Sequence, residues 1–537
     1  MTIHKDAYAQ EAPAPAALAP GSDTLVGTSG ADTIDGGKGD DVIDGRPGPD
    51  LLLGGAGRDN TVWNPGDGSD TVDGGKGEDT LVFNTANVSE IITLSGGDAG
   101  HVLLSRNVGS VNMDLDGVER IVLGGAGGGA DLFVLGDLTR SDVRQVDIDL
   151  GLVGDRLVDT VAAGGTEAAD RIALTSDGGV VTIDGVGTDL IVRHAEAADR
   201  FAVSTGSGDD QLDVSQLKGG IGVAFDGGEG RDSAVANATR ASDTILVVGV
   251  PDAANPGGDR IDFSIDGVAS QLDLRNVEVM TIDAGDGDDL VDAHIYVAQA
   301  GLSVDGGRGD DTLTGGGRAE TLAGGSGDDR IDGGPGADLM CGDAGDDTLV
   351  WNPGGGNDTV DGGKGDDTLA FNTSNISEDI ALSASADGHA LLTRNIGVIS
   401  MDLNDIERVA FAGGGGGADR FTIGDLTETG VDAVDIDLRL VGGSGDSQSD
   451  SVSLTSLTAR HDHLDVHVTG FELHGTTLEG DIMVLNGFAD HSFNEALANQ
   501  HIVQSGGDVV IADGSGLVVT LQGVSLAALT ASDFLFG

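Results

Sequence analysis

The chain has 537 residues, with 91 Asp and Glu against 27 Lys and Arg, and therefore a formal net charge of −64 at pH 7. Binding to nucleic acid depends on clustered Lys and Arg, so this charge excludes nucleic acid as a partner. There are 92 glycines and only 3% aromatic residues, so small aliphatic side chains must form the core, as they do in stacked repeats. The single cysteine, Cys341, excludes an intrachain disulfide, and we expect it on the outer face of a strand.

The chain begins with an Ala/Pro-rich segment, residues 1–20, which we predict to be a disordered tail. Its one lysine is not followed by the apolar stretch of a cleavable signal peptide. No apolar stretch elsewhere approaches the roughly 20 residues that a transmembrane helix needs. We therefore expect neither an N-terminal signal peptide nor a membrane span.

From Gly27 the chain repeats a nine-residue pattern, GGxGxDxUx, in which U is a large apolar residue; GGKGDDVID at 36–44 is a clear unit. The first block is interrupted at Trp63–Asn64. A second block starts at Gly306 and is interrupted at Trp351–Asn352. One apolar residue between two outward ones predicts a three-residue strand whose central side chain points inward.

The sixth position of the units carries a carboxylate, and stacked turns would combine it with backbone carbonyls. Calcium takes about six to eight oxygen ligands at about 2.3–2.6 Å, whereas zinc prefers His or Cys and magnesium a rigid octahedron. Glu320 departs from the pattern, and its unit has Arg318 in place of the third glycine. The predicted calcium ligands are Asp32, Asp41, Asp50, Asp59, Asp70, Asp79, Asp311, Asp329, Asp338, Asp347, Asp358 and Asp367.

These units resemble the calcium-binding nonapeptide repeats of the RTX (repeats-in-toxin) family. The resemblance implies an all-β fold, a parallel β-roll or β-solenoid that binds several calcium ions. The alternative is a flexible Gly/Asp-rich linker. A linker has no need of an apolar residue at every eighth position, so the pattern favours the β-roll.

A second regularity is a duplication, because residues 22–154 realign without a gap on residues 310–442. After each block the apolar residues alternate with polar ones, which predicts half-buried strands of an irregular β-solenoid or β-sandwich. The WNPG interruption recurs in both copies. There are two interpretations of this interruption. Its tryptophan is either a surface aromatic that binds a glycan or part of a corner at which Trp63 and Trp351 cover the core, and we favour the corner.

The sequence predicts seven segments: a tail, two roll blocks, a β module after each block, a degenerate bridge, and a C-terminal cap with a secretion region. Their bounds are 1–20, 21–83 (first roll), 84–204 (β module), 205–305 (bridge), 306–371 (second roll), 372–470 (duplicate β module) and 471–537. Lone degenerate units occur around Asp131, Asp210, Asp232, Asp289 and Asp419. An isolated unit cannot place an ion between neighbouring turns, so these five are not counted among the ligands.

A histidine cluster lies at 460–467, in which His461, His463, Asp465 and His467 would share one face of a strand, with His474 nearby. Imidazoles with a carboxylate bind zinc, copper or nickel. The alternative is a solvated strand face opposite inward aliphatic residues. At about 3.3 Å per residue the four ligands are too spread out to meet at one ion, so we favour the solvated face.

The C-terminal segment, residues 471–537, differs from the rest of the chain in its sequence pattern. A short helix is predicted at Ser492–Asn499, followed by the strands DVVIAD and LVVTLQGV. It ends in Asp533 followed by Phe534, Leu535 and Phe536. This ending is similar to the C-terminal region of RTX proteins that type I channels export. It also suits the capping strand that a repeat array needs.

The chain contains no HExxH, GxSxG or EF-hand pattern, so no enzyme is expected. We expect a secreted, extracellular calcium-binding repeat protein whose β-roll folds on binding extracellular calcium, with a structural or adhesive role. Its expected partners are calcium ions, the type I secretion apparatus and cell-surface or matrix polysaccharide. The alternative is an extracellular polysaccharide-active enzyme (lyase, hydrolase or epimerase) in which carboxylates on a solenoid perform acid–base chemistry.

Overall fold

The computed structural model describes residues 21–124, 128–151, 157–218, 220–253, 257–412, 417–439, 449–457, 463–473, 480–512 and 514–537. The predicted tail at 1–20 lies outside them. The chain divides into two compact units, unit 1 (Met1–Ala234 and Val268–Val277) and unit 2 (Val235–Gly267 and Glu278–Gly537). The described residues form 47 strands, one α-helix and two 3₁₀ helices, so the fold is all-β, as predicted.

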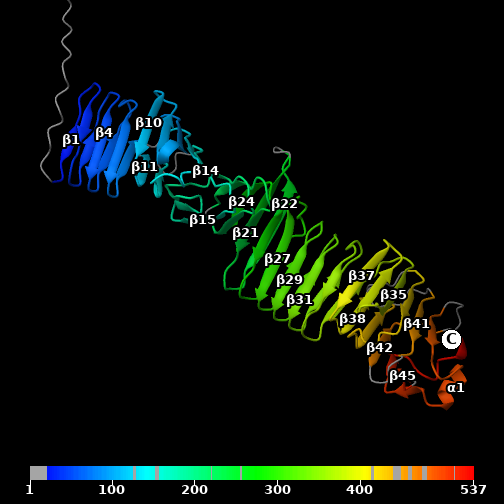
Figure 1. The fold of residues 1–537 in the computed structure, drawn as a ribbon. Helices are drawn as coiled ribbons and strands as arrows, with labels where there is room; N and C mark the ends of the chain where they lie inside the picture. Colours follow the sequence, from blue (N-terminus) through cyan, green and yellow to red (C-terminus); the bar gives the residue numbers. More distant parts are fainter. Residues whose placement is uncertain are drawn as a thin grey trace, which may run out of the picture. The chain divides into compact units, whose positions relative to one another are not determined.

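Unit 1 consists of two sheets whose strands lie side by side like rungs (Figure 1). The first sheet holds β1 (Thr24–Val26), β3 (Val42–Asp44), β5 (Asn60–Trp63), β7 (Thr80–Asn84), β11 (Arg120–Gly124), β13 (Gln145–Asp149), β15 (Arg171–Asp177), β16 (Val180–Asp184), β17 (Asp189–Arg193) and β19 (Gln211–Gln216). The second sheet holds β2 (Thr33–Asp35), β4 (Leu51–Ala56), β6 (Thr71–Lys76), β8 (Ile91–Gly96), β9 (Val102–Arg106), β10 (Val111–Asp116), β12 (Leu132–Leu135), β14 (Thr160–Gly164), β18 (Arg200–Ser204), β20 (Gly222–Asp226) and β24 (Val268–Arg275). A 3₁₀ helix lies at Asp98–Gly100, and β21 (Ser233–Asn237) contains the unit boundary.

Unit 2 is built in the same way from two sheets. The first holds β25 (Val279–Asp283), β27 (Gly301–Arg308), β29 (Thr321–Ser326), β31 (Leu339–Ala344), β33 (Thr359–Asp361), β35 (Asp379–Ala384), β36 (Ala390–Arg394), β37 (Ile399–Asn404), β39 (Arg420–Ile423), β41 (Ser451–Thr455), β43 (Ile482–Asn486) and β47 (Phe534–Phe536). The second holds β22 (Thr244–Pro251), β23 (Gly258–Ile265), β26 (Leu290–Asp292), β28 (Thr312–Thr314), β30 (Arg330–Asp332), β32 (Thr348–Trp351), β34 (Thr368–Asn372), β38 (Arg408–Ala412), β40 (Ala433–Asp437), β42 (Leu464–Thr469), β44 (Ile502–Ser505), β45 (Asp508–Ala512) and β46 (Leu517–Leu521).

The nine-residue period explains this architecture. Each nine-residue repeat supplies one turn and one short strand, and successive strands alternate between the two sheets. β1 pairs in parallel with β3, with Leu25 opposite Ile43, and β2 pairs with β4, with Ile34 opposite Leu52. The central side chains point between the sheets, and Ile43 and Leu52 are fully buried there. The parallel β-roll predicted from the repeats is therefore confirmed.

The strands after each block continue the same sheets rather than forming a separate sandwich. In unit 1, β10 pairs in parallel with β6, then β9 and β8 run antiparallel, and β8 pairs in parallel with β12. In unit 2 the duplicated strands β33, β37, β36, β35 and β39 repeat this order. Of the two architectures left open by the sequence, the structure has the irregular solenoid, with a hairpin added to one turn.

The interrupting tryptophans are core residues at a corner of each roll. Trp63 stacks on Phe83 with ring centroids 4.1 Å apart, and its indole nitrogen donates to the carbonyl oxygen of Gly68 at 2.9 Å. The guanidinium of Arg106 lies over the same ring, 5.3 Å from its centroid, and forms a buried ion pair with Glu90. Trp63 is 1% exposed, so it is not a surface aromatic for a glycan.

We expect Trp351→Ala to destabilise the protein by about 3–5 kcal/mol, the usual cost of removing a fully buried large aromatic side chain. Trp351 stacks on Phe371 with ring centroids 4.2 Å apart and lies below the guanidinium of Arg394. Urea denaturation in calcium would measure the loss. Ile376→Ala serves as the control, because Ile376 is 53% exposed and surface substitutions change stability by only about 0.5 kcal/mol. Equal effects of the two substitutions would contradict the expectation.

The C-terminal segment closes unit 2. The predicted helix is α1 (Phe493–Ala498), capped by Ser492, whose hydroxyl accepts from the amide of Glu495. Thr530 and Asp533 form a capping box at the 3₁₀ helix Ala531–Asp533, and β47 follows and pairs in parallel with β43. The Asp-plus-hydrophobic ending therefore supplies the last strand of a sheet.

Candidate metal centres

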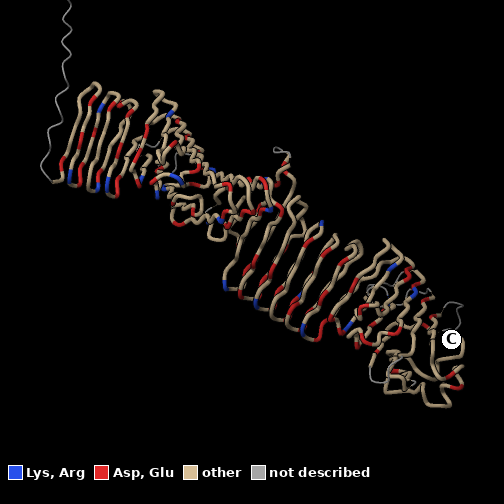
Figure 2. The backbone as a smooth tube through the Cα atoms, viewed as in Figure 1, with Lys and Arg blue, Asp and Glu red and all other residues tan. Residues whose placement is uncertain are grey.

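The position-6 carboxylates form ladders along the edges of the rolls. The amide of Asp41 donates to Oδ1 of Asp59 at 2.8 Å, and the amide of Asp59 donates to Oδ1 of Asp79 at 2.8 Å. The second roll repeats this arrangement from Asp329 to Asp347 and from Asp347 to Asp367, each at 2.8 Å. Figure 2 shows acidic residues recurring from one turn to the next in both rolls. Stacking thus fixes one oxygen of each carboxylate.

The other carboxylate oxygen is, in most turns, buried without a hydrogen-bond partner. Burial of an unpaired carboxylate oxygen is costly, and such oxygens normally find a donor or a cation. All twelve predicted ligands lie in these ladders. Nine of them have such an oxygen: Asp41, Asp50, Asp59, Asp79, Asp311, Asp329, Asp338, Asp347 and Asp367.

Glycine at position 1 keeps space open beside these oxygens. A Cβ on Gly54 would lie 2.8 Å from Oδ2 of Asp59 and 2.5 Å from the carbonyl oxygen of Gly74, so both oxygens face the same space. The glycines with positive φ are at positions 2 and 4, such as Gly37 (φ 87°) and Gly39 (φ 126°). At position 1, where φ is not positive, a side chain is excluded by the lack of space and not by the backbone conformation.

The electrostatics of the ladders favour a bound cation. Burial, followed by repulsion from Asp311 and Asp347, raises the pKa of Asp329 to about 7. Burial likewise raises the pKa of Asp79 to about 6, with Asp59 as the largest repulsive neighbour. A bound cation would reverse these shifts, because an opposite charge favours the ionised carboxylate.

The donor set suits calcium better than a transition metal. Each turn offers carboxylate and carbonyl oxygens, which are the ligands that calcium takes. Within the described residues, no three His, Cys, Asp or Glu side chains converge to hold a metal ion by themselves. A site between stacked turns must therefore draw several ligands from the backbone, which excludes the nitrogen- and sulfur-rich centres of zinc and copper.

Comparison with known proteins agrees with this chemistry. The profile of the RTX calcium-binding nonapeptide repeat (4 copies) matches residues 19–52, 66–84, 303–317, 314–349 and 354–372. This chain is an RTX-repeat protein. RTX nonapeptide repeats bind calcium, so several calcium ions are the cofactor of this RTX-repeat protein.

Among solved structures, the extracellular lipase LipA from Serratia marcescens is similar over 76% of this chain and 45% of the lipase chain, with 16% sequence identity and a TM-score of 0.15. The RTX-repeat protein thus spans less than half of that lipase's length. A search of the curated proteins gave no match.

Three predicted ligands differ from the other nine. Oδ2 of Asp32 accepts from the amide and hydroxyl of Thr28, at 2.6 and 2.9 Å. Asp70 and Asp358 belong to the two units that follow the tryptophans and start with proline instead of glycine. Their Oδ1 atoms still accept the ladder hydrogen bonds, from the amides of Asp50 and Asp338 at 2.9 Å each.

Sequence reasoning left out one residue of the second ladder. Oε2 of Glu320 is buried without a hydrogen-bond partner, and its amide donates to Oδ1 of Asp338 at 2.9 Å. Glu320 therefore occupies the same place in the ladder as the predicted ligands, despite Arg318 nearby. The side chain of Glu320, which is longer than that of aspartate, reaches the place of the usual carboxylate in this altered turn. A search for aspartate alone at the sixth position does not find it.

The expectation that the degenerate units stand alone is wrong. The amide of Asp210 donates to Oδ1 of Asp232, and the amide of Asp289 donates to Oδ1 of Asp311, at 2.8 and 2.7 Å. The amide of Glu90 likewise donates to Oδ1 of Asp131. Degenerate repeats that are separated along the sequence are therefore neighbours in the solenoid.

The histidine cluster has the burial pattern of a solvated strand face. In β42, Leu464, Val466 and Val468 are buried, and His467 points outward and pairs with Asp435 at 2.9 Å. Nε2 of His463 lies 3.6 Å from Asp465. His461 and His474 lie outside the described residues.

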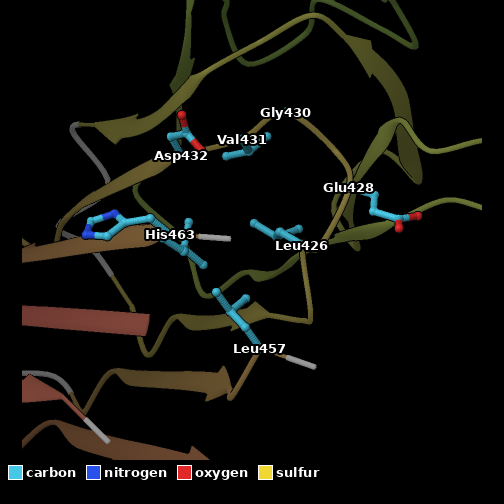
Figure 3. Close-up of a pocket in the computed structure, with 8 residues that line it drawn as sticks. Leu426, Glu428, Gly430, Val431, Asp432, Leu457 and His463 are labelled. Carbon is cyan, nitrogen blue, oxygen red and sulfur yellow. The ribbon is translucent and has the colours of Figure 1, made fainter. Parts of the chain in front are cut away.

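A pocket beside this cluster tests the enzymatic alternative. Glu428, Asp432, His463, Leu426 and Leu457 are among its lining residues. Figure 3 shows the carboxylate of Glu428 directed away from Asp432 and His463. The two carboxylates do not face one another, so this pocket gives no support to acid–base chemistry on a sugar.

Among the described residues, no helix is long and apolar enough to cross a membrane.

Proposed function

We propose that this chain is a secreted protein whose rolls fold when the position-6 aspartates bind extracellular calcium. The twelve predicted ligands and Glu320 would hold the ions together with carbonyl oxygens of adjacent turns. The observation that carries the proposal is the row of buried carboxylate oxygens without hydrogen-bond partners. The repetitive, acidic surface of the solenoid supports a structural or adhesive role at a cell surface or in a polysaccharide matrix.

Calcium supplies the free energy that the rolls otherwise lack. A net charge of −64 opposes compaction, and the ladders bury like charges on successive turns. When an ion binds the folded state and not the unfolded one, its binding free energy becomes folding free energy. Extracellular calcium modules bind at about 10⁻⁴–10⁻³ M, so the chain would stay unfolded in a calcium-poor cytosol and fold outside.

This scheme fits export through a type I channel, the apparatus that we propose as a partner. Such a channel passes unfolded chains, and residues 471–537 would carry the export signal. The last strand, β47, pairs with β43 only in the folded solenoid. The export segment is therefore accessible before folding and part of the cap afterwards.

Far-ultraviolet circular dichroism of the purified protein, titrated with calcium, tests the proposal. We expect a cooperative rise of β signal at about millimolar calcium and no such rise with the same concentration of magnesium. A spectrum that is already fully β in chelator would refute calcium-coupled folding. The aliphatic core would then stabilise the rolls without the ions.

A further inference from the structure

A turn in unit 1 outside the matched repeats has the ladder geometry. The turn 205–210 is stacked between the turns 165–170 and 227–232. The amide of Asp170 donates to Oδ1 of Asp210, and the amide of Asp210 donates to Oδ1 of Asp232, each at 2.8 Å. This stack lies outside every segment that the repeat profile matches.

Two turns in unit 2 extend the second ladder toward the N-terminus. The amide of Asp243 donates to Oδ1 of Asp289 at 2.6 Å, and the amide of Asp289 donates to Oδ1 of Asp311 at 2.7 Å. The turn that ends at Asp243 reads ATRASD and contains no glycine. It nevertheless occupies the position of a repeat turn.

Each of these three turns holds a buried carboxylate oxygen that lacks a hydrogen-bond partner. The oxygens are Oδ2 of Asp210, Oδ1 of Asp243 and Oδ2 of Asp289. The three residues are 1%, 3% and 3% exposed. For Asp210 and Asp289 this is the same observation that marks the predicted ligands in the repeats, and it points to a cation. In Asp243 the oxygen without a partner is Oδ1, because Oδ2 accepts from the amide and hydroxyl of Thr239 at 2.7 and 2.8 Å, as Oδ2 of Asp32 does from Thr28.

The backbone carbonyls are also stacked as in the repeats. A Cβ on Gly325 would overlap the carbonyl oxygen of Gly307, one turn earlier, and one on Gly307 would overlap that of Gly285. The column continues, because a Cβ on Gly285 would overlap the carbonyl oxygen of Thr239. Unit 1 has the same close approach between Gly228 and Gly206.

We propose that Asp210, Asp243 and Asp289 each bind a calcium ion, with ligands from the stacked turns. The inference rests on the proposed function. Position 1 of these turns is Thr205, Ala238 or Ala284 instead of glycine, so a Cβ takes part of the space beside the carboxylate. These sites therefore fill at higher calcium concentration than the repeat sites.

Native mass spectrometry of the calcium-loaded full chain tests the inference by counting bound ions. Asp210→Asn, Asp243→Asn and Asp289→Asn should each lose at least one ion while keeping the others. Asp184→Asn is the matched control, since Asp184 is an exposed residue of β16, and it should keep every ion. An unchanged count in the three variants would overturn the inference, whereas a wild-type chain without calcium would overturn the proposed function instead.

Hydrogen–deuterium exchange of the wild-type chain covers the case in which a variant fails to fold. The chain is loaded with calcium and the free ion is then lowered stepwise with chelator. We expect the turns 205–210, 238–243 and 284–289 to lose protection at a higher free calcium concentration than the turn 324–329. Protection of these three turns that persists in full chelator, while 324–329 exchanges, would overturn the inference.

Discussion

Asp367→Asn is expected to weaken calcium binding by the second roll by about tenfold or more, whereas Asp366→Asn should leave it unchanged. Asp367 is fully buried, its Oδ1 accepts from the amide of Asp347 at 2.8 Å, and its Oδ2 has no partner. Its neighbour Asp366 is exposed. Even partners that only orient a metal ligand typically cost about 10–100-fold in affinity when they are removed. Calcium titration calorimetry of the two variants makes the comparison within one turn.

The sign of the Asp367→Asn effect should reverse in chelator. Burial raises the pKa of Asp367, and repulsion from Asp346, Asp366 and Asp405 raises it further. Asparagine retains an acceptor for the amide of Asp347 but carries no charge. The variant should therefore be more stable than the wild type without calcium and less stable with it, as urea denaturation would show. Destabilisation in both buffers would mean that the carboxylate is a structural acceptor and not a ligand.

The periodic part of the molecule could be read from the sequence. Positions 6 and 8 have fixed spacing, so the pattern predicts both the inward aliphatic residue and the carboxylate at the turn. Ile43 and Asp41 are buried where this pattern puts them. Local spacing suffices here because each turn contacts the turn only 18 residues away.

The places of Asp243 and Glu320 in the ladder depend on the stacking of turns, which local spacing does not reveal. Asp243 contacts Asp289 across 46 residues, because the hairpin β22–β23 is inserted between the two turns. Its turn contains no glycine, so no motif marks it. The buried pair of Arg106 and Glu90 is hidden for a similar reason, since burial of two charged residues becomes visible only when the hairpin packs on Trp63.

Acidification is expected to stabilise the calcium-free protein and to weaken calcium binding over the same pH range. Burial raises the pKa of Asp329 to about 7 and those of Asp311 and Asp347 to about 6, against about 3.9 for aspartate in an unfolded chain. Between about pH 4 and 7 the folded state therefore binds more protons than the unfolded chain. The free energy of unfolding in chelator must then rise as the pH falls, by about 1.4 kcal/mol per pH unit for each extra proton bound.

Other titrating groups can be separated from these carboxylates by the choice of pH. The pKa values of Asp137 and Asp437 are lowered, chiefly by hydrogen bonds from Thr139 and Arg439, so their contributions are lost only below about pH 4. The hydrogen bond that His101 donates to the carboxylate of Asp114 raises the pKa of this histidine. Protonation of this histidine also raises the free energy of unfolding as the pH falls, but it does so at pH values above the ordinary histidine pKa of about 6.5. A series from pH 6 to pH 4.5 thus isolates the ladder carboxylates.

Opposite slopes in two buffers are the signature of carboxylates that serve as calcium ligands. In chelator the proton is the only cation that relieves the buried charge, so urea midpoints should rise from pH 6 to pH 4.5. In saturating calcium the ion already neutralises these oxygens, and protons compete with it, so the midpoints should fall over the same interval. A general loss of surface repulsion would raise both series, because it does not depend on which cation occupies the turns. Midpoints that rise in both buffers would therefore leave the −64 charge, and not the buried ladders, as the origin of the pH dependence.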